Sequence, residues 1–293
     1  MANPRPVQLS SSPRKELALS DEQPGAGEAP QDDSVLFDRL ANGAVQIWLN
    51  RPQRLNALGV EMVRSLLRAT EEAIASGATA LVFRAKGRGF CAGADLKERR
   101  LMAEPERYAH NRAINAAVNA IVAAPVPTIA VLNGVAMGGG LELALGCDIR
   151  IAAEEAQIGL TETRIGAIPG AGGTQRLPRL IGVSRALDLM YTGEPVLARR
   201  ALEIGLVNHC VPNAELDAFV AGYVQLVASR SPTATRVLKK VVYEGMEGSL
   251  QAGLDHERKA LSAILGSSDY AEGLAAFAER RPPRFSREID RTP

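Results

Sequence analysis

The hydrophobic and polar residues of this chain form two kinds of pattern, one typical of strands and one typical of helices. Two short apolar runs, residues 35–40 and 44–50, flank an Asn42-Gly43 pair, and such a pair commonly forms the turn of a β-hairpin. Within residues 58–76, apolar side chains recur every three or four positions, and Gly77 follows. This stretch is therefore predicted to be a helix that ends at the glycine.

The same two kinds of pattern continue through the middle of the chain. Residues 80–85 and 128–133 are short β-rich runs, and a long helical pattern, 106–124, lies between them. A strand, a helix and a strand in this order predict a parallel sheet with crossover helices. After about residue 184 helical patterns dominate, at 198–205, 214–229, 234–246 and 250–265. We expect an α/β core domain over residues 34–220 and a C-terminal helical region over 221–293.

The first 33 residues have a different composition. They contain five prolines among serine, glutamine and acidic residues, and they offer little apolar surface to bury, so we predict a disordered tail. A mitochondrial presequence is the alternative, because the first fifteen residues contain Arg5 and Arg14 and no acid. The prolines and the acids that begin at Glu16 argue against the amphipathic helix that such a presequence forms.

Charge and length narrow the class of protein. A chain of 293 residues with 46% hydrophobic content can bury one large core. The 34 basic and 33 acidic residues nearly cancel, so we expect no nucleic-acid partner. No apolar stretch is long enough to span a bilayer, and we expect no membrane partner either.

Cysteine and histidine usage indicates a reducing compartment and no metal. The three cysteines lack a CxxC pair, and the three histidines are isolated and lack an HExxH pattern. We therefore expect a cytoplasmic protein, or one of the mitochondrial matrix if the source is eukaryotic. The residues are Cys91, Cys147, Cys210, His110, His209 and His256.

Two acidic residues stand where a carboxylate is not expected. Glu142 follows a glycine triplet and is flanked by leucines, and Glu162 precedes another glycine-rich run. Burial raises the pKa of a carboxyl group, and two carboxyl groups in one cleft move each other's pKa values apart. The pair is a candidate general acid and general base.

Two glycine-bearing turns follow predicted strands, over residues 87–97 and 138–144. The first N–H groups of a helix have no partner within the helix, so Gly139 offers a free donor, and a loop N–H near Ala94 offers a second. Two convergent donors form an oxyanion hole. The alternative is that these glycines only permit tight turns.

The sequence does not support a nucleotide-binding glycine loop or a serine or cysteine nucleophile. The chain has neither the phosphate-binding loop, which needs Gly-Lys-Ser/Thr, nor the spacing of the dinucleotide-binding motif. It has no G-x-S-x-G motif for a serine nucleophile. Cys91 lies beside a candidate oxyanion loop, but no histidine is near it in sequence to activate it.

Three motifs, in order along the chain, resemble the crotonase, or enoyl-CoA hydratase/isomerase, superfamily. They are residues 90–98 (FCAGADLKE), residues 127–148 (PTIAVLNGVAMGGGLELALGCD), and residues 156–162 (AQIGLTE) followed by 168–177 (IPGAGGTQRL). The resemblance extends over about residues 35–285. It implies a crotonase spiral fold of repeated ββα units with a C-terminal helical trimerisation region.

The resemblance also implies a role for each matching residue. The N–H groups of Ala94 and Gly139 would bind the thioester carbonyl oxygen, Glu142 would help activate water, and Glu162 would protonate Cα. Further residues would contact CoA, with the last two sometimes acting across a subunit boundary. They are Ala92, Asp95, Leu96, Lys97, Phe277 and Arg280.

Together these points predict an enoyl-CoA hydratase of fatty-acid β-oxidation that adds water in the syn sense. Its partners would be an acyl-CoA substrate and its own copies, in a trimer or a dimer of trimers, and CoA would be part of the substrate with no further cofactor. Residues 94–99 and 279–285 are most similar to methylglutaconyl-CoA hydratases, so hydration of 3-methylglutaconyl-CoA in leucine breakdown is an alternative. Enoyl-CoA isomerisation is another. A non-catalytic CoA-binding or RNA-binding module is disfavoured, because residues 61–72 contain two arginines, three glutamates and no lysine.

Overall fold

The computed structural model describes residues 34–286, and the predicted tail over residues 1–33 lies outside them. The described chain begins with an antiparallel hairpin of β1 (Val35–Arg39) and β2 (Val45–Leu49). Gly43 adopts a left-handed φ of 85°, and the Asn42 side chain accepts a hydrogen bond from the Ala44 N–H. The hairpin prediction is confirmed.

The larger of two sheets has six strands in the order β1-β2-β3-β5-β7-β10. Its further strands are β3 (Leu81–Ala85), β5 (Thr128–Leu132), β7 (Ile149–Ala153) and β10 (His209–Val211). From β2 to β10 all neighbouring strands are parallel. The predicted parallel sheet is therefore confirmed, with the hairpin adding one antiparallel edge.

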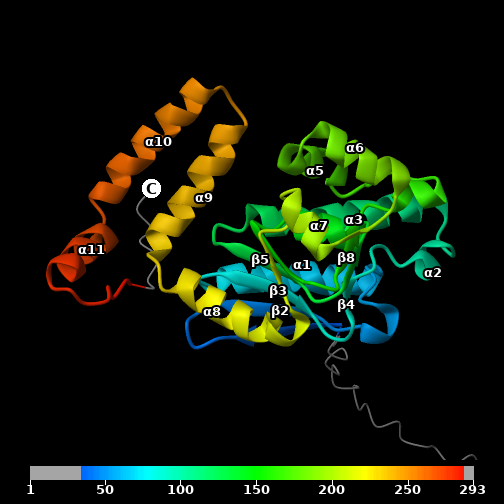
Figure 1. The fold of residues 1–293 in the computed structure, drawn as a ribbon, viewed down its shortest axis with the longest axis horizontal. Coiled ribbons are helices and arrows are strands. Elements are labelled where there is room, and N and C mark those ends of the chain that lie inside the picture. Colours follow the sequence, from blue (N-terminus) through cyan, green and yellow to red (C-terminus); the bar gives the residue numbers. More distant parts are fainter. Residues whose placement is uncertain (1–33, 287–293) are drawn as a thin grey trace, which may run out of the picture. The chain divides into compact units, whose positions relative to one another are not determined.

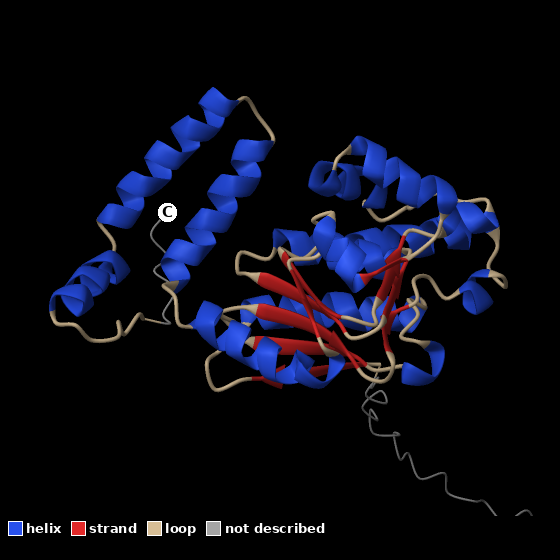
Figure 2. Ribbon diagram, viewed as in Figure 1, coloured by secondary structure: helices blue, strands red, loops and turns tan. Residues whose placement is uncertain are grey.

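A second sheet consists of strands of two or three residues, in the order β4-β6-β8-β9. These strands are β4 (Gly89–Cys91), β6 (Val135–Met137), β8 (Gln157–Gly159) and β9 (Val196–Leu197). Figure 2 shows them crossing the strands of the larger sheet at a steep angle. The sequence did not predict them, because three residues are too few to display an alternating pattern.

Three times the chain leaves the larger sheet, forms one strand of the small sheet, and enters a helical segment. Thus β3 and β4 lead to α2 (Leu96–Arg99) and α3 (Glu104–Ala123), β5 and β6 lead to α4 (Gly139–Leu145), and β7 and β8 lead to a short 3-10 turn. These are the repeated ββα units that the resemblance implied. Because β4, β6 and β8 are parallel, their carboxyl ends meet at one edge.

The inner strands of the larger sheet are buried on both faces, and β3 is an example. Its Leu81 and Phe83 belong to the main core, which includes side chains of α1 (Val60–Ala75) and α3, whereas Val82 packs in a second cluster with α8 (Leu216–Ala228). A strand that is buried on both faces has a continuous apolar sequence, as this one does. The predicted boundary between residues 220 and 221 falls inside α8.

The helices after β8 include all four that were predicted and others that were not. They are α5 (Gly173–Ile181), α6 (Val183–Thr192), α7 (Ala198–Glu203), α8, α9 (Pro232–Met246), α10 (Leu250–Leu265) and α11 (Ser268–Ala278). Helix α5 escaped prediction because it begins among glycines and contains Pro178, which usually interrupts a helix. Among residues 34–286, no helix combines the length and the apolar character that a bilayer crossing requires.

Helices α9 and α10 run side by side beyond α8 (Figure 1). The first of them is fixed to the core by Asp148, whose carboxylate pairs with Lys239 at 2.9 Å and accepts a hydrogen bond from the Tyr243 hydroxyl at 2.9 Å. Neither helix contains a fully buried residue. Large apolar side chains are exposed along both helices, among them Leu238, Val242, Met246, Leu250, Leu261 and Leu265.

Candidate active site

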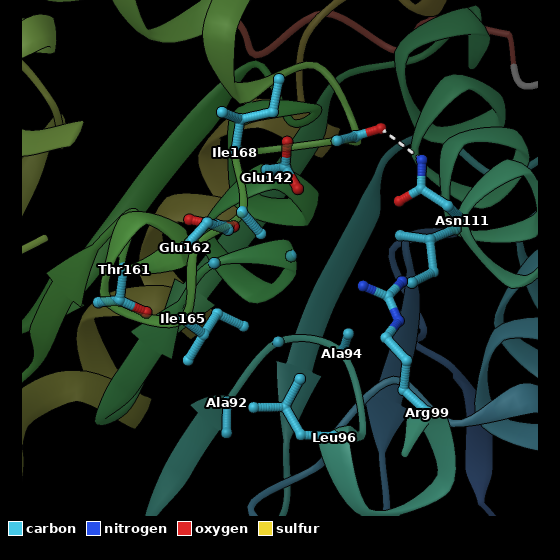
Figure 3. A pocket seen from close by; sticks show the side chains of 16 residues that line it. Ala92, Ala94, Leu96, Arg99, Asn111, Glu142, Thr161, Glu162, Ile165 and Ile168 are labelled. Carbon is cyan, nitrogen blue, oxygen red and sulfur yellow. Dashed lines mark hydrogen bonds between the residues drawn. The ribbon is translucent and has the colours of Figure 1, made fainter. Parts of the chain in front are cut away.

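A cavity of about 120 Å³ opens at the carboxyl ends of β4, β6 and β8, and Figure 3 shows its lining. This volume exceeds what one water molecule needs. The lining residues come from the loop after β4, from α2, from the middle of α3, from the start of α4 and from the segment after β8. They are Ala92, Gly93, Ala94, Leu96, Arg99, Asn111, Ile114, Gly138, Gly139, Glu142, Thr161, Glu162, Ile165, Ala167, Ile168 and Gly170.

The loop after β4 and the start of α4 approach each other closely. A Cβ atom on Gly93, which has a φ of 89°, would lie 3.2 Å from the Gly139 nitrogen and 2.8 Å from the Met137 carbonyl oxygen. A Cβ on Gly139 would lie 3.6 Å from the Ala94 nitrogen. Neither the Ala94 N–H nor the Gly139 N–H has a hydrogen-bond partner within residues 34–286. The cavity wall therefore carries two neighbouring free donors.

Glu142 lies one helical turn after Gly139, so both face the cavity. Its side chain is only 3% exposed, and its Oε1 accepts hydrogen bonds from the Gly173 N–H at 2.8 Å and the Ala171 N–H at 2.6 Å. Burial raises the pKa of Glu142, and these two donors oppose that rise because they stabilise the ionised form. The carboxyl group is thus held in one orientation by backbone groups.

Glu162 begins the short 3-10 turn Glu162–Ile165 after β8. Its Oε2 is buried and has no hydrogen-bond partner among the described residues. Burial raises the pKa of Glu162 to about 7, and the negative charge of Glu142 adds to the rise. A side chain at Gly138 would place a Cβ 2.9 Å from Glu162 Oε1, so the glycine leaves room for this carboxyl group.

The two carboxyl groups consequently differ in character although they share a cavity. Glu142 is tied to two backbone donors, whereas Glu162 has one oxygen without a partner and titrates near neutral pH. A site with one held carboxyl group and one group that is protonated in part at pH 7 can accept a proton at one point and donate one at another. The free N–H pair beside them can stabilise a developing oxyanion.

Of the four other residues expected around the oxyanion loop, two line the cavity and two do not. Ala92 and Leu96 line the cavity, but Asp95 and Lys97 do not. Asp95 is 4% exposed and caps α2, since its Oδ1 accepts from the Lys97 N–H at 3.1 Å and the Glu98 N–H at 3.2 Å. Its Oδ2 pairs with Arg54 at 2.9 Å. Asp95 therefore fixes the loop that carries Ala94, and the Lys97 side chain is exposed.

Phe277 and Arg280 lie outside the cavity of their own chain. Phe277 is 86% exposed near the end of α11, and Arg280 is exposed just beyond that helix. A Phe side chain with this exposure contributes almost nothing to the packing of its own chain. Any contact of these two residues with CoA stays a prediction.

The structure adds no support for a cysteine nucleophile or for metal binding. Cys91 is buried, and burial raises the pKa of its thiol to about 12, so the nucleophilic thiolate is scarce at neutral pH. His110 is buried as well, and His209 packs against the rings of Phe219 and Tyr223. Within the described part of the chain, no three His, Cys, Asp or Glu side chains are grouped to hold a metal ion.

Some residues of the cavity were not identified from the sequence. Arg99 and Asn111 are polar, and Asn111 donates a hydrogen bond to the Gly170 carbonyl at 3.1 Å (Figure 3). Ile165 and Ile168 are apolar residues of the lining. Arg99 could have been found, because it follows the oxyanion loop and lies three positions after Leu96, on the same side of a helical turn.

Comparison with known proteins gives consistent results. Residues 39–288 match the family model "Enoyl-CoA hydratase/isomerase". The chain is 40% identical over 264 residues to a probable enoyl-CoA hydratase 2, mitochondrial, of Arabidopsis thaliana, covering 88% of each chain. It is 41% identical over 253 residues to the mitochondrial methylglutaconyl-CoA hydratase of Homo sapiens, covering 84% of this chain and 74% of the relative. A crystal structure of an enoyl-CoA hydratase from Bacillus anthracis superposes with a TM-score of 0.84 at 40% identity, covering 87% of this chain and all of that one.

Proposed function

Because the chain belongs to the enoyl-CoA hydratase/isomerase family, we propose that it adds water across the α,β double bond of a 2-enoyl-CoA thioester. One observation carries the proposal: a carboxyl group held by two backbone donors and a carboxyl group with an unpartnered oxygen share a cavity with two free backbone N–H groups. Hydration of a conjugated thioester needs this combination, since a water proton has to be removed, a carbon protonated and an enolate stabilised.

The proposed reaction assigns one task to each group. The thioester oxygen accepts hydrogen bonds from the N–H groups of Ala94 and Gly139, which stabilise negative charge as it develops on that oxygen. Glu142 accepts a proton from the water molecule whose oxygen bonds to Cβ. Protonated Glu162 gives its proton to Cα, and the electron pair of the double bond forms the new C–H bond. Addition from one face gives the syn product.

Two carboxyl groups favour hydration over the isomerase alternative, because moving a double bond requires one group that carries a proton between carbons and no activated water. The coenzyme A of the substrate is the only coenzyme in the proposed reaction. Hydration of 3-methylglutaconyl-CoA remains a specific form of the same proposal, supported by the name of the human relative. Fatty-acid β-oxidation is the corresponding role for a straight-chain substrate.

A hydration assay tests the proposed function. Purified protein with crotonyl-CoA is expected to consume the conjugated thioester, measured by its ultraviolet absorbance, and to form 3-hydroxybutyryl-CoA, measured by mass. A parallel assay with 3-methylglutaconyl-CoA compares the two substrates. A doubly substituted control, Glu142→Gln with Glu162→Gln, identifies any contaminating hydratase. Absence of turnover on both thioesters by folded protein would contradict the proposal.

We further propose that the chain assembles as a trimer or a dimer of trimers. The support is the row of exposed apolar side chains on α9 and α10, which closed symmetry would bury without open-ended growth. Phe277 and Arg280 could then complete the CoA site of a neighbouring copy. Light scattering after size exclusion at micromolar concentration is expected to give about three or six times the chain mass of 31.1 kDa. A single species at the chain mass would rule out this assembly.

The proposed cellular compartment rests on the relatives of this chain. Relatives from Arabidopsis thaliana and Homo sapiens are named mitochondrial, and a similar protein is known from Bacillus subtilis, which has no mitochondria. We retain the cytoplasm, or the mitochondrial matrix in a eukaryotic cell, as the proposed location.

A further inference from the structure

An arginine without an acidic partner stands in the wall of the cavity. Arg99 is the last residue of α2, and among the described residues that line the cavity it is the only lysine or arginine. Its Nε atom is buried and has no hydrogen-bond partner, and no ion pair joins it to a carboxylate within residues 34–286. A guanidinium group that is partly removed from water in this way loses hydration and gains no ion pair in return.

The acidic residues around Arg99 are already engaged elsewhere. Asp95 pairs with Arg54 and caps α2. Glu98 accepts a hydrogen bond from the Val60 N–H at 3.0 Å and lies within 4 Å of Arg51 and Arg54 at 3.5 and 3.7 Å. Arg99 therefore has no neighbour in its own sequence segment that is free to neutralise it.

The remaining charges near Arg99 leave this side of the cavity positive. Burial and the positive charge of Arg107 both lower the pKa of Arg99, whereas Glu142 raises it. Glu142, however, accepts hydrogen bonds from the N–H groups of Ala171 and Gly173 and forms no ion pair with Arg99. Burial lowers the pKa of His110 below its usual 6.5, so this imidazole adds no charge at pH 7.

Arg99 also lies opposite the two glutamates. In Figure 3 its side chain rises from the α2 side of the cavity towards Asn111, while Glu142 and Glu162 occupy the other wall. A thioester bound at Ala94 and Gly139 places its reacting carbons between these walls. The long pantetheine arm separates the phosphates of CoA from its sulfur, so an anion that reaches Arg99 from within the cavity has to belong to the acyl chain.

We propose that Arg99 binds a carboxylate at the end of the acyl chain, so that the preferred substrate is a 2-enoyl-CoA thioester with a second, terminal carboxylate. This inference rests on the proposed function, because it assigns the substrate class of the same cavity. A carboxylate matches the planar guanidinium fork and can accept two parallel hydrogen bonds from it. A neutral acyl chain would leave the partly buried guanidinium without an ion pair, which is how the site would discriminate.

A matched pair of thioesters tests the inference. Glutaconyl-CoA carries the terminal carboxylate, and its neutral counterpart has an isopropyl group of similar shape in that place. The wild-type protein is expected to show a higher kcat/KM for glutaconyl-CoA. Arg99→Met keeps the length of the side chain and removes its charge, and it should lower kcat/KM for glutaconyl-CoA about 10- to 10²-fold while leaving the neutral thioester unchanged or faster.

Two further variants test whether the effect is specific to the guanidinium group of Arg99. Arg100→Met removes a neighbouring charge that is exposed and outside the cavity, so it should change neither substrate by more than about twofold. Arg99→Lys keeps a charge without the planar fork and should recover part of the loss. If Arg99→Met weakened both thioesters equally, Arg99 would be contacting the common CoA portion, and the inference would be overturned. An unchanged ratio between the two thioesters would overturn it too.

A binding measurement tests this inference independently of the proposed function. Calorimetry with glutaryl-CoA and its saturated isopropyl counterpart requires no turnover, and glutaryl-CoA is expected to bind at least about 10-fold more tightly to the wild-type protein but not to Arg99→Met. If no thioester is hydrated, the proposed function fails while this difference still decides the role of Arg99. If crotonyl-CoA is hydrated and the difference is absent, the inference fails and the function stands.

Discussion

Glu162→Gln is expected to lower the rate of hydration about 10²- to 10⁴-fold, which is the usual loss when a positioned proton-transfer group is removed. Glutamine has the same shape but cannot give up a proton to Cα. Circular dichroism and CoA-thioester binding should stay close to those of the wild-type protein. Glu71→Gln, an exposed position on α1, is the matched control and should retain full activity. Near wild-type turnover by Glu162→Gln would remove this residue from the mechanism.

The same variant should change the pH dependence. The pKa of Glu162 is raised to about 7, and the proposed reaction needs its protonated form. The protonated fraction falls as pH rises through 7, so kcat/KM of the wild-type protein should fall about tenfold per unit well above that pH. The residual activity of Glu162→Gln should lack this dependence when both proteins are assayed from pH 5 to 9.

Stability provides an independent readout of Glu162. Its folded-state pKa of about 7 lies above the reference value of 4.5, so the folded state binds the proton more tightly than the unfolded state. The wild-type protein therefore loses stability as pH rises from about 4.5 to 7, and the loss is complete above 7. Glu162→Gln carries no such charge and should gain melting temperature relative to the wild-type protein at pH 8, with little gain at pH 4. An equal difference at both values would contradict the raised pKa.

Glu142→Gln should cause a similar loss of rate for a different reason. The amide cannot accept the proton of the attacking water, and its NH₂ group would face the N–H donors of Ala171 and Gly173 if it took the place of Oε1. The glutamine carbonyl oxygen can accept from both donors if it takes the place of Oε1, so circular dichroism and CoA-thioester binding should stay close to those of the wild-type protein. A variant with full activity would exclude the role proposed for Glu142.

Gly139→Pro is expected to reduce the rate about 10²- to 10³-fold, the typical effect of losing one oxyanion donor. Proline removes the N–H and leaves the rest of α4 in place, since it is well tolerated as the first residue of a helix. The preceding Gly138 has a φ of 51°, and proline restricts the residue before it, so folding has to be confirmed by circular dichroism first.

Gly139→Ala is the control for this variant because it keeps the N–H. Its Cβ would lie 3.3 Å from the Leu58 side chain, a tight contact that a small shift of that side chain can relieve. Most of the activity should therefore remain in Gly139→Ala and be lost in Gly139→Pro. If the folded proline variant were as active as the alanine variant, the Gly139 N–H would have no part in the reaction.

The sequence by itself determined those features that depend on local order. The Asn42-Gly43 turn, the apolar strand runs and the periodic helices could be predicted because backbone preference and burial leave a repeating pattern in neighbouring residues. Glu142 was noticeable for the same reason, as an acid inside an apolar run. The order of the motifs was enough to indicate the family, which the comparisons confirm.

Only the tertiary structure decided which polar atoms meet. The donors to Glu142 come from 29 and 31 positions further along the chain, and Asp95 caps α2 and pairs with Arg54 instead of facing the cavity. The three-residue strands β4, β6 and β8 carry no pattern of their own, yet their parallel pairing brings the loops of the cavity together. Hydrogen bonding and burial, which set the pKa of Glu162 and leave Arg99 without a partner, depend on contacts between distant segments, and a local pattern does not encode those contacts.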